Sequence, residues 1–546
     1  MTRSRTVITT PERPGVPGSR RGLWQGTPPR RLLLLGSVTA AVAVIPLVYL
    51  IVRVFGAGLD RIIDVLWRTR TLDTVLTSAA LVLVVTLACL LIGIPAAWLV
   101  SRTTLPLRGM WLVLLALPLA MPSYVAAYAW IAQFPWFTGF PAAALVLTLV
   151  SFPYVALPTA AAFRFADPGV EEVARSLGRS PVRAFTTATL PQAWPAAAAG
   201  SLLVALYVLS DFGAVALFRV DAFTRVIYAS YRGSFDRVSA AVLALILVAF
   251  AALLVWAERR ARGRQTRWRV AGSIQRDHIP VRLCRGPTIV ATGSLVLLLI
   301  LALGVPLASL INLMVRSREL DLDIGELLGA TLGSTGVSLL GAVIAVALAL
   351  PVGVLAARYR TRSVRGVETL SYSGHALPGV VVGLSLVFFT LSVAPFAYQT
   401  IVTLAVAYAV LFLPKAIGAT RSATAAVPPI LEATARTLGR GPASAWWSTT
   451  ARLTAPGIAA GGLLVWLTAM KELPATLMLR PTGLDTLATE LWSRTEIAAY
   501  GAAAPYAITL VVVAAIPAWL LSRAMTRHRG ATEDTDAPVI PVTVGP

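Results

Sequence analysis

The sequence predicts an all-α polytopic membrane protein with about 12 transmembrane helices, arranged as two parallel six-helix repeats. Three observations lead to this prediction. The 546-residue chain is 57% hydrophobic and only 13% charged, whereas a soluble domain carries about 25% charged residues. Its apolar residues gather in runs of roughly 20, the length at which a helix crosses a bilayer. The two halves also share charged, glycine and proline residues at a fixed spacing.

Twelve apolar runs mark the expected membrane helices, and the lipid bilayer is therefore an expected partner of the chain. In the first half the runs lie near residues 33–54, 75–100, 111–133, 142–163, 196–217 and 238–257. In the second half they lie near residues 288–314, 332–357, 372–394, 398–418, 457–479 and 498–522.

Segments of a different composition flank these runs and set the expected domain boundaries. We expect a first transmembrane domain at 33–257 and a second at 288–525, joined by an arginine-rich cytoplasmic linker at 258–287. The ends, 1–32 and 526–546, lack a long apolar run and are expected to be disordered cytoplasmic tails.

Basic residues determine the expected orientation. The chain has 47 Lys and Arg against 25 Asp and Glu, a formal net charge of +22. In a soluble protein this excess would suggest a nucleic-acid partner. Here the basic residues lie in short loops between apolar runs, so no nucleic-acid partner is expected. Loops rich in Lys and Arg stay in the cytoplasm, which predicts a multi-pass protein of the bacterial cytoplasmic (inner) membrane with both termini cytoplasmic.

The two halves repeat in register. Glu432 lies 261 residues after Glu171, and other charged, glycine and proline residues keep the same spacing. Each half has six expected spans, an even number, so both copies enter the membrane in the same sense and form a parallel repeat. The further matches are Arg175 with Arg436, Gly178 with Gly439, Pro181 with Pro442, Pro195 with Pro456, and Gly200 with Gly461.

The loop between the fourth and fifth spans of each half is the most informative segment. It reads D-P-G-V-E-E-V-A-R-S-L-G-R-S-P-V-R-A-F at residues 167–185 and L-E-A-T-A-R-T-L-G-R-G-P-A-S-A-W at residues 431–446. Gly178 and Gly439 can take the left-handed conformation that ends a helix. The proline three residues later suits the first turn of a new helix. Each copy therefore predicts a helix, a stop and a second helix, which together form a rigid knob.

This pattern resembles the E-A-A loop of bacterial ABC importer permeases, the MetI-like inner-membrane components. In that family the loop is a coupling helix that docks in a groove on the ATPase subunit. The resemblance implies that two ATPase subunits bind here, that they bind the ATP, and that this chain carries no cofactor of its own. The second copy departs from the pattern, since Ala433 stands at the place of Glu172 and Arg452 replaces the proline of the L-P pair. The expected coupling residues are Glu171, Glu172, Ala174, Gly178, Pro181, Glu432, Ala435, Gly439 and Pro442.

A second resemblance concerns the segment after each coupling loop. From Met470 the chain reads M-K-E-L-P-A-T-L-M-L-R-P-T-G-L-D-T-L-A-T-E-L-W, and from Ser210 it reads S-D-F-G-A-V-A-L-F-R-V. These segments are similar to those of fused, two-domain permeases of ferric iron importers, and the resemblance runs from about residue 35 to 525. It implies an extracytoplasmic solute-binding protein that delivers ferric iron. Fused thiamine permeases share this architecture, so thiamine, or another small solute such as a polyamine, phosphonate or sulfate, is the alternative.

Three ionisable residues lie inside expected spans. Asp211 is about 15 residues into the fifth span, and Lys471 and Glu472 are equally deep in the eleventh. Ionisable groups at such depth usually face the bundle interior or an aqueous path, so these three are candidate pathway residues. The alternative is a packing role in which Lys471 neutralises a carboxylate. Carboxylates suit a hard cation, but two are too few for a coordination site, and no metal site is expected.

Arginines at the inner ends of two spans also repeat. Arg102 ends the second span and Arg358 ends the eighth. A long basic side chain at a helix end extends its charge to the headgroup region while its stem covers apolar surface. Both arginines are therefore expected to be membrane anchors with no further role.

The chain also lacks the signature of an ATPase. A phosphate-binding loop ends in G-K-[ST], yet neither of the two lysines, Lys415 and Lys471, follows a glycine. We therefore expect a transport subunit and not an enzyme. A secondary transporter would explain the repeat but not the two helix–stop–helix loops. A polytopic membrane enzyme would need a cluster of His, Asp or Glu near one interface, and the chain has only three histidines.

Overall fold

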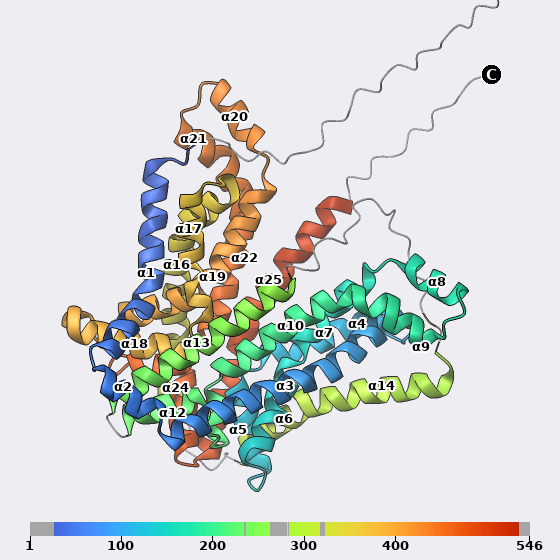
Figure 1. Ribbon diagram of the computed structural model, residues 1–546, viewed down its shortest axis with the longest axis horizontal. Coiled ribbons are helices and arrows are strands. Elements are labelled where there is room, and N and C mark those ends of the chain that lie inside the picture. Colours follow the sequence, from blue (N-terminus) through green and yellow to red (C-terminus); the bar gives the residue numbers. More distant parts are fainter. Residues whose placement is uncertain (1–26, 234–235, 263–280, 282, 317–322, 534–546) are drawn as a thin grey trace, which may run out of the picture.

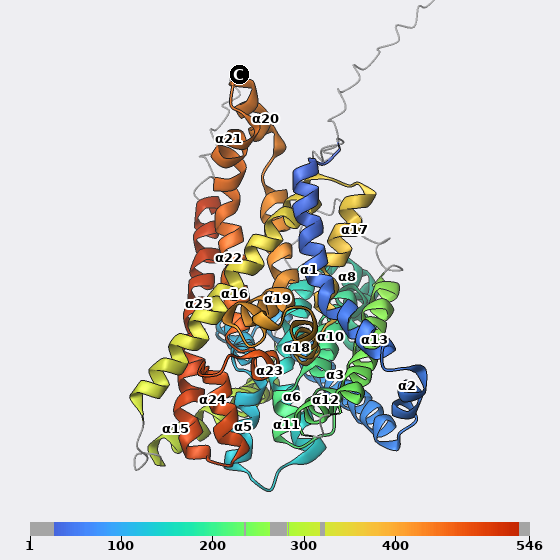
Figure 2. The same ribbon diagram turned by 90° about the vertical axis from the view of Figure 1, so that its left-hand side faces the viewer.

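The computed structural model describes residues 27–233, 236–262, 281, 283–316 and 323–533, which form helices joined by short loops (Figures 1 and 2). In this part of the chain the only β pairing is an isolated bridge between Thr103 and Val281. In the described residues nine helical segments, some of which join successive labelled helices, are long and apolar enough to cross a membrane, or ten if the bent pair at residues 108–133 is one span. The predicted all-α polytopic fold is confirmed, whereas the predicted count of about 12 spans is not.

Corresponding helices occur in the same order in the two halves. The first half contains α1 (Arg30–Phe55), α2 (Leu59–Leu66), α3 (Thr69–Arg102), α4 (Arg108–Ala116), α5 (Ser123–Gln133), α6 (Gly139–Ser151), α7 (Pro153–Arg164), α8 (Pro168–Ser176), α9 (Pro181–Ala184), α10 (Leu190–Ser210), α11 (Gly213–Leu217), α12 (Phe223–Arg232) and α13 (Arg237–Arg262). The second contains α14 (Arg285–Leu299), α15 (Val305–Arg316), α16 (Ile324–Arg358), α17 (Arg362–Ser371), α18 (Gly379–Val393), α19 (Ile401–Ala426), α20 (Pro429–Thr437), α21 (Pro442–Trp446), α22 (Arg452–Ala469), α23 (Pro474–Leu479), α24 (Leu487–Glu496) and α25 (Tyr500–Glu533).

The third expected span of each half is interrupted. In the first half α4 and the 3₁₀ turn η1 (Leu117–Ala120) meet α5 at an angle of 86°. In the second half α18 begins only after Pro378 and has 15 residues. Pro122 and Pro378 stand directly before α5 and α18. Proline lacks an amide hydrogen and disfavours helical geometry in the residue before it. Both expected straight crossings, 111–133 and 372–394, are therefore broken elements.

The first membrane span of each half, α1 in the first and α14 with α15 in the second, packs against the other half. Helix α1 lies along α16, α17 and α18 (Figures 1 and 2), and the hydroxyl of Thr39 donates a hydrogen bond to the Leu348 carbonyl oxygen (2.9 Å). Helix α15 packs on α5, where the Ser309 hydroxyl donates to the Ala129 carbonyl oxygen (2.8 Å). This exchange joins the two repeats into one bundle.

Glycines permit close contact between the helices that carry the loops. A Cβ at Gly200 of α10 would collide with the backbone of Tyr154 in α7. A Cβ at the corresponding Gly461 of α22 would collide with the Ala419 side chain of α19. Small residues at such crossings let helices approach closely and pack well within a membrane. The stems of both loops are therefore fixed against neighbouring helices.

The boundaries of the expected linker and tails are partly helical. Helix α13 continues to Arg262, α14 begins at Arg285, and α25 continues to Glu533. The remainder of the expected tails and linker, at 1–26, 263–280, 282 and 534–546, lies outside the described residues.

Candidate functional site

Both repeat loops form the expected helix–stop–helix. Helix α8 is followed by Gly178 at φ 81°, and α20 by Gly439 at φ 85°. Both angles lie in the left-handed region, which glycine adopts without a steric penalty. The next helices, α9 and α21, each begin with a proline. We call residues 167–189 the first knob and residues 428–451 the second knob. They lie at the ends of two arms of the molecule (Figure 1).

The glutamates at corresponding positions of the knobs face inward. Glu171 accepts a hydrogen bond from the Thr189 hydroxyl (2.6 Å). Glu432 pairs with Arg436 (2.6 Å) and accepts from the Thr450 hydroxyl (3.4 Å). Thr189 and Thr450 belong to the π turns η2 (Phe185–Thr189) and η8 (Trp447–Ala451), which lead into α10 and α22. Each glutamate thus ties the knob to the helix that follows it.

The other predicted coupling residues divide between the inside and the surface of the knobs. Ala174 and Ala435 are buried, at 9% and 8% exposure, and their small side chains let the first helix of each knob pack on the rest. Glu172 is exposed, and so are both stop glycines and both following prolines. Only these outer residues are available to a partner. That the knobs bind a partner remains a prediction.

The arginines at the ends of α3 and α16 are not membrane anchors, so that expectation is wrong. Arg102 is 1% exposed and Arg358 is 7% exposed. Each arginine is attracted electrostatically by the glutamate of the adjacent knob, Arg102 by Glu171 and Arg358 by Glu432. Arg358 donates to the Val427 carbonyl oxygen (3.0 Å). Within the described residues none of the guanidinium nitrogens of Arg102 has a hydrogen-bond partner.

These buried arginines place a positive charge behind each knob. Opposite charges attract more strongly where water is excluded, so each arginine favours the inward-facing state of its knob glutamate. Just beyond α16, burial and the Glu432 carboxylate raise the pKa of Tyr359 above its ordinary value. The sequence signal for this pairing was that both halves carry the same arginine and the same glutamate, in the same order.

The candidate pathway carboxylates lie just after helix ends and not inside membrane helices, which corrects the sequence-based placement. Helix α10 ends at Ser210, and Asp211 is extended. Its carboxylate accepts from the amides of Ala214 (3.0 Å) and Val215 (3.4 Å). Glu472 lies in the short loop that follows α22, which ends at Ala469.

Glu472 accepts hydrogen bonds from the amides of Ala475 (3.0 Å) and Thr476 (3.1 Å) and from the Thr476 hydroxyl (2.9 Å). Both carboxylates therefore cap the short helix that follows, α11 or α23, by satisfying amides that have no partner within the helix. A packing role is present for both residues, and a role in the pathway remains a prediction.

The two caps are completed by different residue pairs. The Asp211 carboxylate accepts a hydrogen bond from the Ser123 hydroxyl. At the place of Ser123 the second half has Gly379, and the longer Glu472 fills the space that a side chain there would need. A short acid with serine in one half thus corresponds to a long acid with glycine in the other.

Lys471 connects the two halves. Its ammonium donates to the carbonyl oxygens of Ala120 (2.6 Å) and Leu119 (3.4 Å) in η1 of the first half. In the described structure it makes no ion pair with the adjacent Glu472, so the expected neutralisation of a carboxylate is wrong. In the described parts of the chain no group of three or more His, Cys, Asp or Glu could hold a metal ion.

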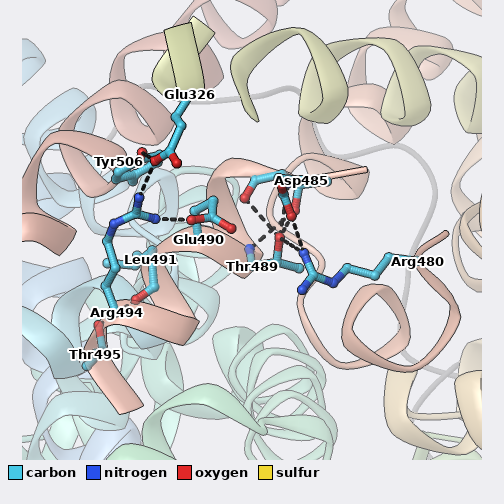
Figure 3. A network of polar contacts seen from close by, with 10 residues as sticks. Glu326, Arg480, Asp485, Thr489, Glu490, Leu491, Arg494, Thr495 and Tyr506 are labelled. Atoms are coloured by element: carbon cyan, nitrogen blue, oxygen red, sulfur yellow. Dashed lines mark hydrogen bonds and ion pairs between the residues drawn. The ribbon is translucent and has the colours of Figure 1, made fainter. Parts of the chain in front are cut away.

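A polar network ties α16, α24 and α25 together (Figure 3), and α24 lies at the end of the second half opposite its knob (Figure 1). Arg494 of α24 pairs with Glu326 of α16 (2.8 Å), and its guanidinium lies 4.1 Å from the centre of the Tyr506 ring of α25. In the neighbouring loop Arg480 pairs with Asp485 (2.5 Å). The R-P-T-G-L-D segment singled out in the sequence therefore forms a closed turn beside this network.

Comparison with known proteins finds the same repeat. The family model described as binding-protein-dependent transport system inner membrane component matches residues 89–264 and again 349–527. Each match contains one knob.

Individual relatives differ in how much of the chain they match. The chain is 34% identical over 498 residues to the Fe(3+)-transport system permease protein FbpB 2 of Haemophilus influenzae, covering 91% of this chain and 98% of that protein. It is 31% identical over 207 residues to the molybdenum transport system permease protein ModB of Mycobacterium bovis, covering 34% of this chain and 77% of that protein. It is 26% identical over 199 residues to the sulfate transport system permease protein CysW of Escherichia coli, covering 33% and 67%.

Proposed function

Because the chain belongs to the family of binding-protein-dependent transport system inner membrane components, we propose that it is an ABC importer permease whose solute is ferric iron. The observation that carries the choice of solute is the likeness to an Fe(3+)-transport permease over nearly the whole length of both chains. The molybdenum and sulfate permeases match only about a third of this chain.

In this proposal the chain supplies the complete membrane pathway, since both repeats are fused. A solute-binding protein delivers iron on the outer side. Two ATPase subunits bind on the cytoplasmic side, one at each knob, and both termini are cytoplasmic. The exposed Glu172, Gly178 and Pro181 of the first knob, with Gly439 and Pro442 of the second, would form the docking surfaces.

The contacts described above give these docking surfaces a route to the pathway. A displaced knob pulls on the helix behind it, because Glu171 is bonded to the π turn that begins α10, and Glu432 to the turn that begins α22. At their far ends these helices lead into Asp211 and Glu472, which cap α11 and α23. A movement of the knobs would therefore reach the short helices between the halves, where the pathway would open.

Uptake measurements test the solute. A strain that lacks the gene should lose uptake of radioactive ferric iron, and a plasmid copy of the chain should restore it, without any change in uptake of molybdate or sulfate. Normal growth under iron limitation together with a new requirement for thiamine would reject ferric iron. Uptake that persists when the ATPase is inactivated but stops when the ion gradient is abolished would indicate a secondary transporter instead.

A further inference from the structure

An apolar groove runs between α16 and α22 of the second half and encloses about 710 Å³. One wall consists of Val343, Val346 and Leu350 of α16, and the other of Ile458, Gly462 and Trp466 of α22. The groove runs along several turns of both helices, so it is long enough to hold an extended chain.

One end of the groove opens into a smaller polar pocket of about 440 Å³ beside the second knob. The two hollows share Trp447, Ala451 and Ala455 as lining residues, so they are continuous. The pocket adds Ser444, Ser448 and Arg452. Arg452 is exposed.

Arg452 is a free cation in this setting. Among the residues that the structure describes its guanidinium makes no hydrogen bond or ion pair, whereas Arg436 of the adjacent second knob is paired with Glu432 (2.6 Å). A guanidinium presents donors in a planar fork that matches two oxygens of a phosphate. The pocket therefore offers an anion site at the mouth of an apolar slot.

The surroundings indicate that the slot faces lipid. Helix α16 is one of the helices long and apolar enough to cross a membrane. Trp446 and Trp447 stand at the mouth, with ring centres 5.1 Å apart in an edge-to-face arrangement. Tryptophan gathers at the headgroup level of a bilayer, because its ring is apolar and its N–H is polar. The mouth then lies at headgroup level and the groove at the level of the acyl chains.

We propose that this groove binds one anionic glycerophospholipid. Its phosphate contacts Arg452 and the hydroxyls of Ser444 and Ser448, and an acyl chain fills the slot between α16 and α22. Basic pockets between membrane helices bind such headgroups through charge. A zwitterionic lipid has the same phosphate but brings a second cation near Arg452, so it binds more weakly.

The site belongs to one half only. At the places of Arg452 and Trp447 the first half has Pro191 and Thr186. The proposal thus predicts one such lipid for each chain. It requires that the chain spans a membrane, as its family does, and it is independent of which solute is transported.

Native mass spectrometry of the full-length chain tests the site. The chain is purified in mild detergent and incubated with equal amounts of phosphatidylglycerol and phosphatidylcholine. The wild type should retain one phosphatidylglycerol in clear excess. Arg452→Gln should lower that retention by about tenfold, since a charge-assisted hydrogen bond is lost, and should abolish the preference. Arg365→Gln, which removes an exposed arginine of α17 that does not line the groove, should behave as the wild type.

A second variant tests the slot itself. Ala459 lines the groove and is exposed, so Ala459→Phe fills the space without disturbing a buried contact. It should lose retention of both lipids while its thermal unfolding stays that of the wild type. A wild type with no preference for phosphatidylglycerol would overturn the proposal, as would full retention in Ala459→Phe. A second protein chain bound in place of lipid would also overturn it.

Discussion

At the scale of single residues, the stop glycines of the knobs offer a test of coupling. Gly178 has φ 81°, where a side chain costs on the order of 1 kcal/mol or more. No atom lies within 4 Å of the place of a Cβ there, so a substitution strains only the backbone. We expect Gly178→Val to misalign α9 and to lower substrate-stimulated ATP hydrolysis by the reconstituted complex, with normal membrane insertion.

Gly178→Asn is the matched control, because asparagine tolerates the left-handed conformation far better than a β-branched residue. It should retain most of the stimulation. Unchanged stimulation in Gly178→Val would show that the shape of the first knob does not matter for coupling.

The two helix caps allow a swap between the halves. Gly379→Ser alone should push a side chain against the Glu472 carboxylate and destabilise the protein by roughly 1–3 kcal/mol through overpacking. Adding Glu472→Asp recreates the pair that Ser123 and Asp211 form in the first half, and should recover much of that loss. The measurement is the midpoint of thermal unfolding in detergent for the wild type, both single variants and the double variant. Additive losses would disprove the compensation.

At the scale of helices, the crossing of α10 on α7 depends on Gly200. A Cβ there would collide with the α7 backbone at Tyr154, and a backbone moves less easily than a side-chain end. We expect Gly200→Val to separate the two helices and to lower the unfolding midpoint and the yield of folded protein by an amount equivalent to roughly 1–3 kcal/mol or more.

Gly329→Val is the control for helix propensity. Gly329 is also helical, in α16, and has open space at the place of a Cβ. Gly329→Val introduces the same β-branched side chain as Gly200→Val, but without a collision, so this variant should lose little stability. Equal unfolding midpoints for the two variants would mean that close packing at Gly200 contributes nothing measurable.

At the scale of the whole molecule, Lys471 holds the two repeats together. Its ammonium satisfies carbonyl oxygens of η1 in the other half. Lys471→Met keeps much of the apolar stem and removes the donor, so the contact between the halves should loosen. Amide hydrogen exchange over residues 117–125 should then accelerate by roughly tenfold, the equivalent of one charge-assisted hydrogen bond.

Lys415→Met gives the comparison within one half. That ammonium donates to Thr468 of its own half (3.0 Å), so its removal should leave exchange at 117–125 unchanged. If Lys471→Met also left that exchange unchanged, the hydrogen bonds from Lys471 to η1 would not contribute to the stability of the contact between the halves.

The sequence by itself determined the features that depend on neighbouring residues. Apolar runs predicted an all-helical membrane protein, and the spacing of Glu171 and Glu432 predicted a parallel repeat. Gly178 and Gly439, each followed by a proline, predicted the knobs, because a left-handed stop and a fixed φ act on the residues beside them. The same local chemistry is present at Pro122 and Pro378, where a proline interrupts the third expected span of each half.

The tertiary structure alone decided the contacts between residues far apart in the chain. A span-length estimate placed Asp211 and Glu472 inside helices, but each instead accepts amide hydrogens at the start of a following short helix. Arg102 was expected to be a membrane anchor, yet it is buried, and Lys471 bonds to the other half. Burial and hydrogen bonding depend on which distant segments meet, and hydropathy along the chain does not contain that information.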